Sequence, residues 1–323
     1  MLEPKRIRGL HVYTGEGFDY GVVTSDMLNE LKSRRINTFV IHLGHQNHVR
    51  FDQYNSFGTP TSIVNRSISD LDDFLREWNR SELAESEMYV GLPLLHDNIA
   101  TINDADSFYS HYVDFMREVK DTIIDRLGQD YWDQDFAGFY FRTEAVYPIQ
   151  EKISSTNPTS NPMVKLMNDL SYRIRNTYER QFLWCPYYGH GSNMDNIIHN
   201  LGVVANRTNI FDAICIQPAY YYAGSAYRNN LDLVFESANS NEVVDADGDP
   251  VSGGRRSSAT AAIGVNMEAD NNFNTTKATQ FNAYVDTFSP LIGEAPIVFY
   301  ANATENLVNN EELLDAIEDF YRS

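Results

Sequence analysis

Eight short runs rich in β-branched and aromatic residues alternate with longer stretches of helical periodicity, and this alternation restricts the fold more than any other feature of the chain. The β-rich runs cover residues 7–13, 37–43, 88–95, 136–142, 181–188, 212–218, 261–268 and 296–302. The helical stretches cover residues 25–35, 67–80, 104–128, 162–180, 192–202, 226–239, 276–290 and 305–323. Because eight parallel strands joined by helices close on themselves, the sequence predicts the class α/β and a single (β/α)8 TIM barrel as one domain over residues 1–323.

Alternate residues of these runs differ in character, as expected when one set faces a barrel interior and the other faces helices. The predicted interior set is small near the start of each run and polar near its end: Gly9, His11, Tyr13, Val40, His42, Gly91, Pro93, Gly138, Tyr140, Arg142, Glu144, Gly264, Asn266 and Glu268. The opposite set is apolar: Leu10, Val12, Phe39, Ile41, Val90, Leu92, Phe139, Phe141, Ile263, Val265 and Met267. Enzymes on this fold act at the C-terminal ends of the strands, so the pattern predicts a polar site there.

The composition is that of a folded, acidic protein, with 42% hydrophobic residues and a formal net charge of -20. This charge repels nucleic acid and anionic membranes, so we expect neither as a partner. No run approaches the roughly 18 to 20 apolar residues of a membrane span, and the first residues lack the apolar core of a signal peptide. The sequence leaves the location open: we expect an extracellular protein if a signal was removed and a cytoplasmic one otherwise. The sequence leaves the oligomeric state open.

Two cysteines are present, Cys185 and Cys215, and both lie in runs that read as neighbouring strands. Two thiols cannot form a disulfide framework. We expect both to be reduced and to serve as small buried hydrophobes.

Two glutamates follow β-rich runs at the point where a polar loop begins. Glu144 ends the run FAGFYFRTE after the fourth predicted strand, and Glu268 lies at the end of the seventh, in AAIGVNMEAD. Both would project into one mouth of the barrel. Two facing carboxylates are what hydrolysis of a glycosidic bond requires, so we expect both to be catalytic. Asp270, two residues further on, is the rival of Glu268.

Aromatic, imidazole and amide side chains gather at the same predicted strand ends, and such groups suit a ligand rich in hydroxyls. The candidate substrate-binding residues are His11, Tyr13, His42, Arg142, Tyr187, Tyr188, Gln217, Tyr220, Asn266, Asp270 and Tyr300. Arg142 could hold a carboxylate ionised or bind a sugar hydroxyl.

Other chemistries find little support in the sequence. His11, His42, His96 and His190 lack the spacing of a metal site, so we expect no metal and no cofactor. The segment DADGDP, residues 245–250, starts like a calcium loop, but Pro250 replaces the required Gly and Arg256 the terminal Glu. We expect a solvated turn there.

The runs GFYFRTE, PYYG, IQPAYY and GVNMEAD, in that order, resemble an uncharacterised group of bacterial and archaeal TIM-barrel domains regarded as glycoside-hydrolase-like. The placement of Glu144 and Glu268 is also similar to the large retaining clan of glycosidases, which has its acid/base after strand four and its nucleophile after strand seven. This resemblance implies the same roles for Glu144 and Glu268. That clan usually has Asn directly before the first Glu, where this chain has Thr143.

The sequence therefore predicts a glycoside hydrolase that acts on an oligo- or polysaccharide, most simply by the retaining route. Retention requires carboxyl groups about 5 Å apart, and a gap of roughly 6.5 to 9.5 Å implies inversion. The alternatives are a non-catalytic carbohydrate-binding or structural barrel, and a lyase acting on an acidic sugar.

Overall fold

The computed structural model describes residues 3–15, 22–32, 34–44, 51, 58–95, 99–301 and 304–323, and eight strands in it close into one parallel barrel in chain order. The strands are β1 (Arg8–Thr14), β2 (Thr38–Leu43), β3 (Glu87–Gly91), β4 (Phe136–Phe141), β5 (Gln181–Trp184), β6 (Ala213–Ile216), β7 (Ala262–Glu268) and β8 (Ile297–Tyr300). The barrel closes where β1 pairs with β8, with Arg8 opposite Ile297. The predicted α/β class and (β/α)8 barrel are confirmed.

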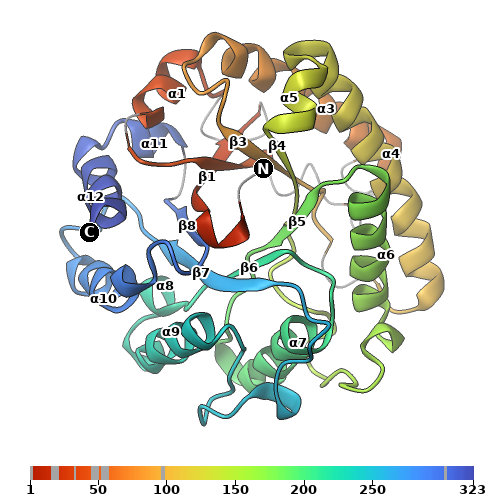
Figure 1. Ribbon diagram of the computed structural model, residues 1–323, viewed down its shortest axis with the longest axis vertical. Coiled ribbons are helices and arrows are strands. Elements are labelled where there is room, and N and C mark those ends of the chain that lie inside the picture. Colours follow the sequence, from red (N-terminus) through yellow and green to blue (C-terminus); the bar gives the residue numbers. More distant parts are fainter. Residues whose placement is uncertain are drawn as a thin grey trace.

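Helices surround the barrel as a continuous ring (Figure 1). They are α1 (Ser25–Lys32), α3 (Pro60–Arg80), α4 (Ile102–Leu127), α5 (Gln129–Gln134), α6 (Pro162–Thr177), α7 (Met194–Arg207), α8 (Tyr220–Ala223), α9 (Asn229–Ser240), α10 (Ala278–Phe288), α11 (Thr304–Val308) and α12 (Glu311–Arg322). Short 3-10 turns are η1 (Pro4–Arg6), η4 (Pro158–Ser160), η5 (Gly191–Asn193), η6 (Ser225–Tyr227), η7 (Val251–Gly253) and η8 (Ser289–Leu291).

Several predicted boundaries differ from the observed ones, and capping explains two of the differences. α3 begins at Pro60, well before residue 67, because the Thr59 side chain accepts from the Ser62 N–H and Pro suits the first turn. The stretch 305–323, predicted as one helix, is two helices, because the Asn310 side chain caps a new start at Glu311. The predicted strand 181–188 ends at Trp184, and Pro186 beyond it has no N–H to donate.

The core has two layers, separated by the barrel wall. An inner cluster fills the barrel: Ile7, Val40, Tyr89, Ala137, Tyr140, Leu183, Cys185, Ala213, Cys215 and Val298. An outer cluster between strands and helices contains all eleven predicted outward residues, Leu10, Val12, Phe39, Ile41, Val90, Leu92, Phe139, Phe141, Ile263, Val265 and Met267. Cys185 and Cys215 are buried and free, as expected. The alternation read from the sequence thus assigns the two faces of the strands correctly.

Glycine lets the two acid-bearing strands pack against their neighbours. A Cβ atom on Gly138 of β4 would lie 1.9 Å from the Gln181 carbonyl oxygen, and one on Gly264 of β7 would lie 1.8 Å from that of Pro296. No side chain fits at either position, so both glycines are needed for the observed strand spacing.

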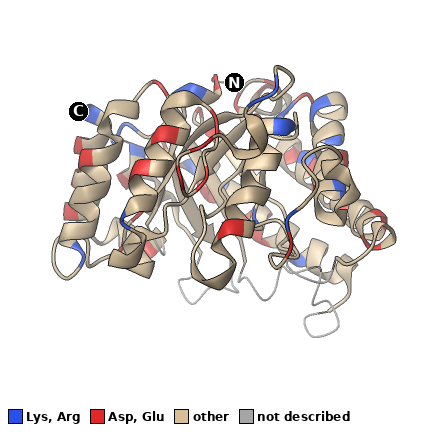
Figure 2. Ribbon diagram, turned by 90° about the horizontal axis from the view of Figure 1, so that it is seen from below, with Lys and Arg blue, Asp and Glu red and all other residues tan. Residues whose placement is uncertain are grey.

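Charged residues are found mainly on the outer helices and the loops, with both signs interspersed (Figure 2). The two chain ends lie at the same end of the barrel, and Tyr321 of α12 bonds there to the Gly9 and Ile297 carbonyls. Within the described ranges, no helix has the length and apolar character needed to cross a membrane.

Candidate active site in the barrel mouth

Glu144 lies just beyond the C-terminal end of β4, and its side chain is exposed to solvent. The Gln217 amide donates to Glu144 Oε1 at 3.0 Å and to the Cys185 carbonyl at 2.7 Å, which fixes the amide between β5 and β6. The surrounding barrel wall still desolvates this accessible carboxylate, and the pKa of Glu144 is raised above its ordinary value for that reason. Gln217, predicted to bind substrate, therefore orients Glu144.

Glu268 ends β7 and is almost fully buried. Tyr284 of α10 donates its hydroxyl to Glu268 Oε2 at 2.5 Å and accepts from the Tyr221 N–H at 3.3 Å. Burial raises the pKa of Glu268 from 4.5 to about 7, although the Tyr284 hydroxyl and the Ala219 and Tyr221 N–H groups favour the ionised form. Ala219 has a left-handed backbone, φ 63°, which turns the chain at the start of α8 toward Glu268.

The two acids influence each other. The charge of Glu144 adds to burial in raising the pKa of Glu268, so ionisation of Glu144 opposes ionisation of Glu268. The mouth thus holds one accessible and one enclosed carboxyl group whose titrations are linked. A pair of acids in unlike surroundings is suited to divide the roles of proton donor and charged group.

On the other side of the mouth, His11 of β1 and His42 of β2 form a direct contact, with His11 Nδ1 and His42 Nε2 2.6 Å apart. Burial lowers the pKa of His11 to about 3 and that of His42 well below its ordinary value, so both rings are neutral near pH 7. Asn266 lies near His11 and opposes the lowering of its pKa, but Asn266 Oδ1 and His11 Nε2 do not reach hydrogen-bond geometry. Arg142 is also buried here and donates to the Leu43 carbonyl at 3.3 Å.

An aromatic wall connects this histidine pair with the region of Glu268. Tyr13 stacks on His42 with ring centroids 4.2 Å apart, and Tyr300 meets Tyr13 edge-on at 5.8 Å. Tyr222 continues the wall to Tyr300 at 6.1 Å and is 43% exposed, while its hydroxyl is held by the Ala269 carbonyl. Such a wall offers ring faces to a ligand in the mouth.

Some predicted binding residues lie elsewhere. The Tyr188 ring is buried, and its hydroxyl donates to the carbonyls of Val244 and Asp245, away from Glu144 and Glu268. Tyr220 is buried and stacks with Tyr284. Tyr188 and Tyr220 therefore support the site by packing within the protein.

Asp270 and Tyr187 lie at the rim. Asp270 accepts from the Tyr221 hydroxyl at 2.8 Å and from the Asn272 N–H at 2.8 Å, which organises the loop after β7. Tyr187 is half-buried, packs on His190 at 4.9 Å and bonds through its N–H to the Glu144 carbonyl. The structure thus gathers His11, Tyr13, His42, Arg142, Glu144, Gln217, Asn266, Glu268 and Tyr300 around the mouth.

Thr143, which stands where the retaining clan has Asn, is buried and serves the backbone. Its hydroxyl donates to the Leu95 carbonyl and accepts from the Leu95 N–H at 3.2 Å, and the Trp184 indole donates to the Thr143 carbonyl at 2.6 Å. Thr143 therefore fixes the conformation of the loop after β4.

Sequence reasoning missed Tyr284, which holds Glu268. It lies in the predicted stretch 276–290, where it reads as one more apolar residue facing the core. Its hydroxyl was the available signal, because a buried tyrosine needs a partner for its polar end.

No metal cluster is present in the part of the chain that the structure describes, since no three His, Cys, Asp or Glu side chains there are grouped to hold an ion. His96, considered with His11 and His42 as a ligand, lies outside the described residues. The segment 245–250 forms a turn in which Asp245 Oδ1 accepts from the N–H groups of Asp247 and Asp249.

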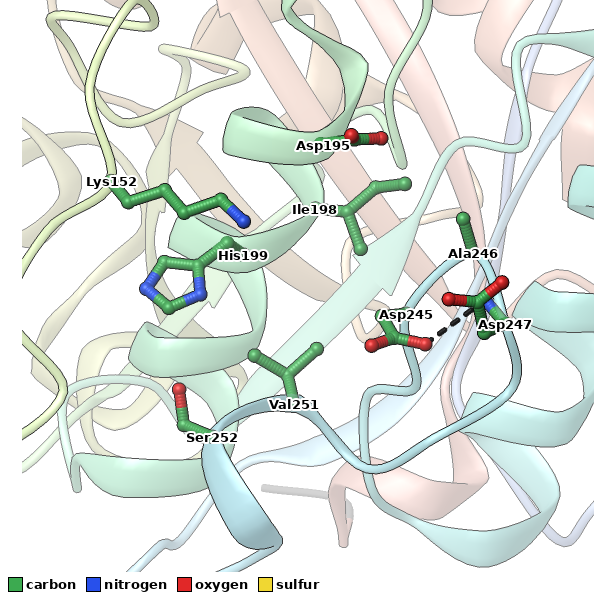
Figure 3. A pocket seen from close by; sticks show the side chains of 9 residues that line it. All are labelled: Lys152, Asp195, Ile198, His199, Asp245, Ala246, Asp247, Val251 and Ser252. Carbon is green, nitrogen blue, oxygen red and sulfur yellow. Dashed lines mark hydrogen bonds between the residues drawn. The ribbon is translucent and has the colours of Figure 1, made fainter.

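A separate hollow of about 200 Å³ lies between α7 and the turn at residues 245–252 (Figure 3). Its lining residues are Lys152, Asp195, Ile198, His199, Asp245, Ala246, Asp247, Val251 and Ser252. None of them is a predicted site residue. The acids of the mouth, and not this hollow, therefore define the candidate active site.

No family model matches this chain, and no curated protein matches it in sequence. Among solved structures, it is similar to a GH18 chitinase from Pseudoalteromonas aurantia, with 8% identity over 97% of this chain and 99% of that one and a TM-score of 0.47. The xylanase-A-amylase inhibitor protein XAIP-III has 11% identity over 97% of both chains and a TM-score of 0.41. The spore cortex-lytic enzyme SleL of Bacillus megaterium QM B1551 has 10% identity over 97% of this chain and 73% of that one, with a TM-score of 0.40. These similarities concern the barrel alone.

Proposed function

We propose that this protein hydrolyses a glycosidic bond in an oligo- or polysaccharide and that Glu144 and Glu268 are its catalytic carboxylates. The observation that carries the proposal is the linked pair of acids at the ends of β4 and β7, with the pKa of Glu268 raised to about 7. The aromatic wall of Tyr13, Tyr222 and Tyr300 beside them supplies ring faces for sugars.

The surroundings of the two acids support different roles. Glu268 is enclosed, and Tyr284 fixes its orientation, as a nucleophile at the anomeric carbon requires. Glu144 is exposed and held by one amide, so a leaving group and then a water molecule can reach it. Glu144 would thus protonate the leaving oxygen and later activate water, which is the retaining route.

The retaining route needs its proton on Glu144 while Glu268 is ionised. In the open mouth burial and the charge of Glu144 raise the pKa of Glu268 to about 7, so Glu268 is largely protonated below that pH. A bound sugar would exclude water from the accessible Glu144 and raise the pKa of that group further. Protonation of Glu144 would then remove the charge that opposes ionisation of Glu268, and the Tyr284 hydroxyl would stabilise the resulting carboxylate.

The test is a panel of glycosides and polysaccharides assayed with wild type, Glu144→Gln and Glu268→Gln. We expect each variant to lose about 10³-fold or more of its hydrolysis and to retain oligosaccharide binding. Glu236→Gln on α9 is a matched control, because Glu236 is exposed and far along the chain from either acid. If no glycan is hydrolysed and the substitutions leave glycan binding unchanged, a carbohydrate-binding barrel is the better description.

Azide rescue separates the two roles. In Glu268→Ala, azide should replace the nucleophile and give a glycosyl azide of inverted configuration. In Glu144→Ala, azide should attack the glycosyl-enzyme intermediate and give the retained configuration. The reverse pattern would exchange the roles of Glu144 and Glu268.

A further inference from the structure

Arg142 differs from Arg180, the other buried arginine among the described residues, in having almost no partner. It is 5% exposed, and its one hydrogen bond goes from Nη1 to the Leu43 carbonyl at 3.3 Å. Among the described residues, no carboxylate lies within ion-pair distance of it. Burial lowers the pKa of Arg142, yet a guanidinium remains charged at neutral pH. A buried charge with so few bonds is costly unless something else binds to it.

Arg180 shows how this chain satisfies a structural arginine. Arg180 donates to the carbonyls of Glu179 and Trp132. Its Nη2 lies 3.7 Å from Asp133 Oδ1, and its guanidinium lies over the Trp132 ring. Arg255 likewise donates to three backbone carbonyls. A purely structural role for Arg142 would predict a similar set of acceptors.

The fold makes room for Arg142 at the mouth. A Cβ atom on Gly91 would lie 2.9 Å from Arg142 Cδ, so the side chain crosses β3 where only glycine leaves space, and it reaches the end of β2 at Leu43. Arg142 Nε and Nη2 have no hydrogen bond within the described structure, and neither belongs to its fully enclosed unpartnered atoms. These two donors therefore keep a small accessible surface and have no protein acceptor among the described residues.

The neighbours of Arg142 cannot neutralise it. His11 and His42 are neutral, and the charge of Arg142 is one cause of their lowered pKa values. Tyr13 and Tyr140 add aromatic surface, and their pKa values are raised well above normal, so both hydroxyls stay protonated. Glu144 is near enough to favour the charged form of Arg142 but makes no ion pair with it.

We infer that Arg142 binds the carboxylate of an acidic sugar, so that the substrate of this site carries a uronic acid at the reacting ring. A guanidinium offers paired N–H donors that match the two oxygens of a carboxylate. This inference rests on the proposed function, because Glu144 and Glu268 in the same mouth would act on the anomeric carbon of that ring. The net charge of -20 opposes polyanions at long range, but salt screens this repulsion beyond about 8 to 10 Å.

The experiment measures binding and needs no turnover. D-glucuronate and D-galacturonate are titrated into wild type by calorimetry, beside D-glucose, D-galactose, the methyl esters of both uronates, and acetate. We expect a uronate to bind about 10- to 100-fold more tightly than its parent sugar, its ester or acetate. The esters keep the shape and remove the charge, so this arm tests the inference without any substitution.

Variants extend the test. Arg142→Gln should lose the same 10- to 100-fold in uronate affinity, Arg142→Lys should lose less, and Arg117→Gln should change nothing. Arg117 is a matched control because it is exposed on α4 and its removal changes the net charge equally. The inference is overturned if no uronate binds, if ester, parent sugar or acetate binds as tightly, or if a folded Arg142→Gln protein keeps its uronate affinity.

The two proposals can fail separately. Uronates that bind through Arg142 without any uronide being hydrolysed would remove the hydrolase and leave the binding site. Hydrolysis of neutral glycosides that survives in Arg142→Gln would keep the hydrolase and remove the acidic-sugar site.

Discussion

The two sides of the barrel mouth hold ionisable groups whose pKa values shift in opposite directions. On the β1–β2 side, burial makes His11 and His42 neutral by lowering their pKa values. On the β4–β7 side, burial raises the pKa values of Glu144 and Glu268. Low polarisability disfavours the charged form of acids and bases alike, so one physical cause has opposite effects on pKa. The comparison teaches that Arg142, which cannot lose its proton, is the exception in this mouth.

His11, on the β1–β2 side of the mouth, should determine how the free energy of unfolding changes at acidic pH. The pKa of His11 falls from 6.5 in the unfolded chain to about 3 in the folded protein. The contribution of His11 to folding stability is therefore complete above pH 6.5 and is lost as the pH falls toward 3. His11→Gln should therefore lose about 3 kcal/mol less stability than wild type between pH 7 and pH 4. Urea unfolding at both pH values measures this, with His190→Gln, an exposed histidine, as control. Equal losses in both proteins would mean that His11 accepts a proton in the folded state.

Glu268, on the β4–β7 side of the mouth, should show the opposite dependence of stability on pH. The pKa of Glu268 rises from 4.5 to about 7, so its contribution to stability is complete below pH 4.5 and is lost as the pH rises through 7. Glu268→Gln should therefore gain about 3 kcal/mol relative to wild type between pH 4.5 and pH 8. Denaturant titrations at the two pH values, with Glu236→Gln beside them, measure the gain. A pH-independent difference would show that Glu268 titrates normally.

Tyr284 acts against burial at Glu268, because its hydroxyl favours the ionised form of this enclosed acid. Tyr284→Phe removes the donated bond, so the pKa of Glu268 should rise, the acidic limb of the pH–rate profile should move upward and kcat should fall about 10-fold. Tyr172→Phe serves as control, since Tyr172 is 70% exposed on α6. A fall in kcat with an unmoved limb would indicate a packing role alone.

Asp270 should produce the smallest effect. Its carboxylate is engaged with the Tyr221 hydroxyl and the Asn272 N–H, so Asp270→Asn should cost less than about 1 kcal/mol of stability and change kcat by no more than about threefold. Melting curves and the glycoside assay check both values. A loss as large as that of Glu268→Gln would make Asp270 the second catalytic acid.

The strands were predictable because the barrel imposes a strict alternation. Leu10, Phe139 and Val265 show the apolar side of that pattern, and each was assigned to its observed layer. The ends of β4 and β7 follow directly, so Glu144 and Glu268 could be placed at one mouth from the sequence. Element boundaries set by single caps, such as those of Thr59 and Asn310, were harder to find.

The contacts that tune the acids were not predictable. Tyr284 reaches Glu268 across the boundary between a helix and a strand, and no periodicity reports which hydroxyl meets which carboxylate. The left-handed turn at Ala219 also leaves no signal in the sequence, because alanine has no preference for φ 63°. Tyr188 reads like its neighbour Tyr187, yet the chain after β5 turns its ring toward Val244.

The glycines of β4 and β7 have a consequence for protein engineering. Gly138 and Gly264 leave the neighbouring carbonyl oxygens less than 2 Å from where a methyl group would stand. Any substitution at Gly138 or Gly264 would displace a whole strand together with the carboxylate at its end. Mutant libraries aimed at new specificity should therefore keep these two glycines and vary the residues at the rim.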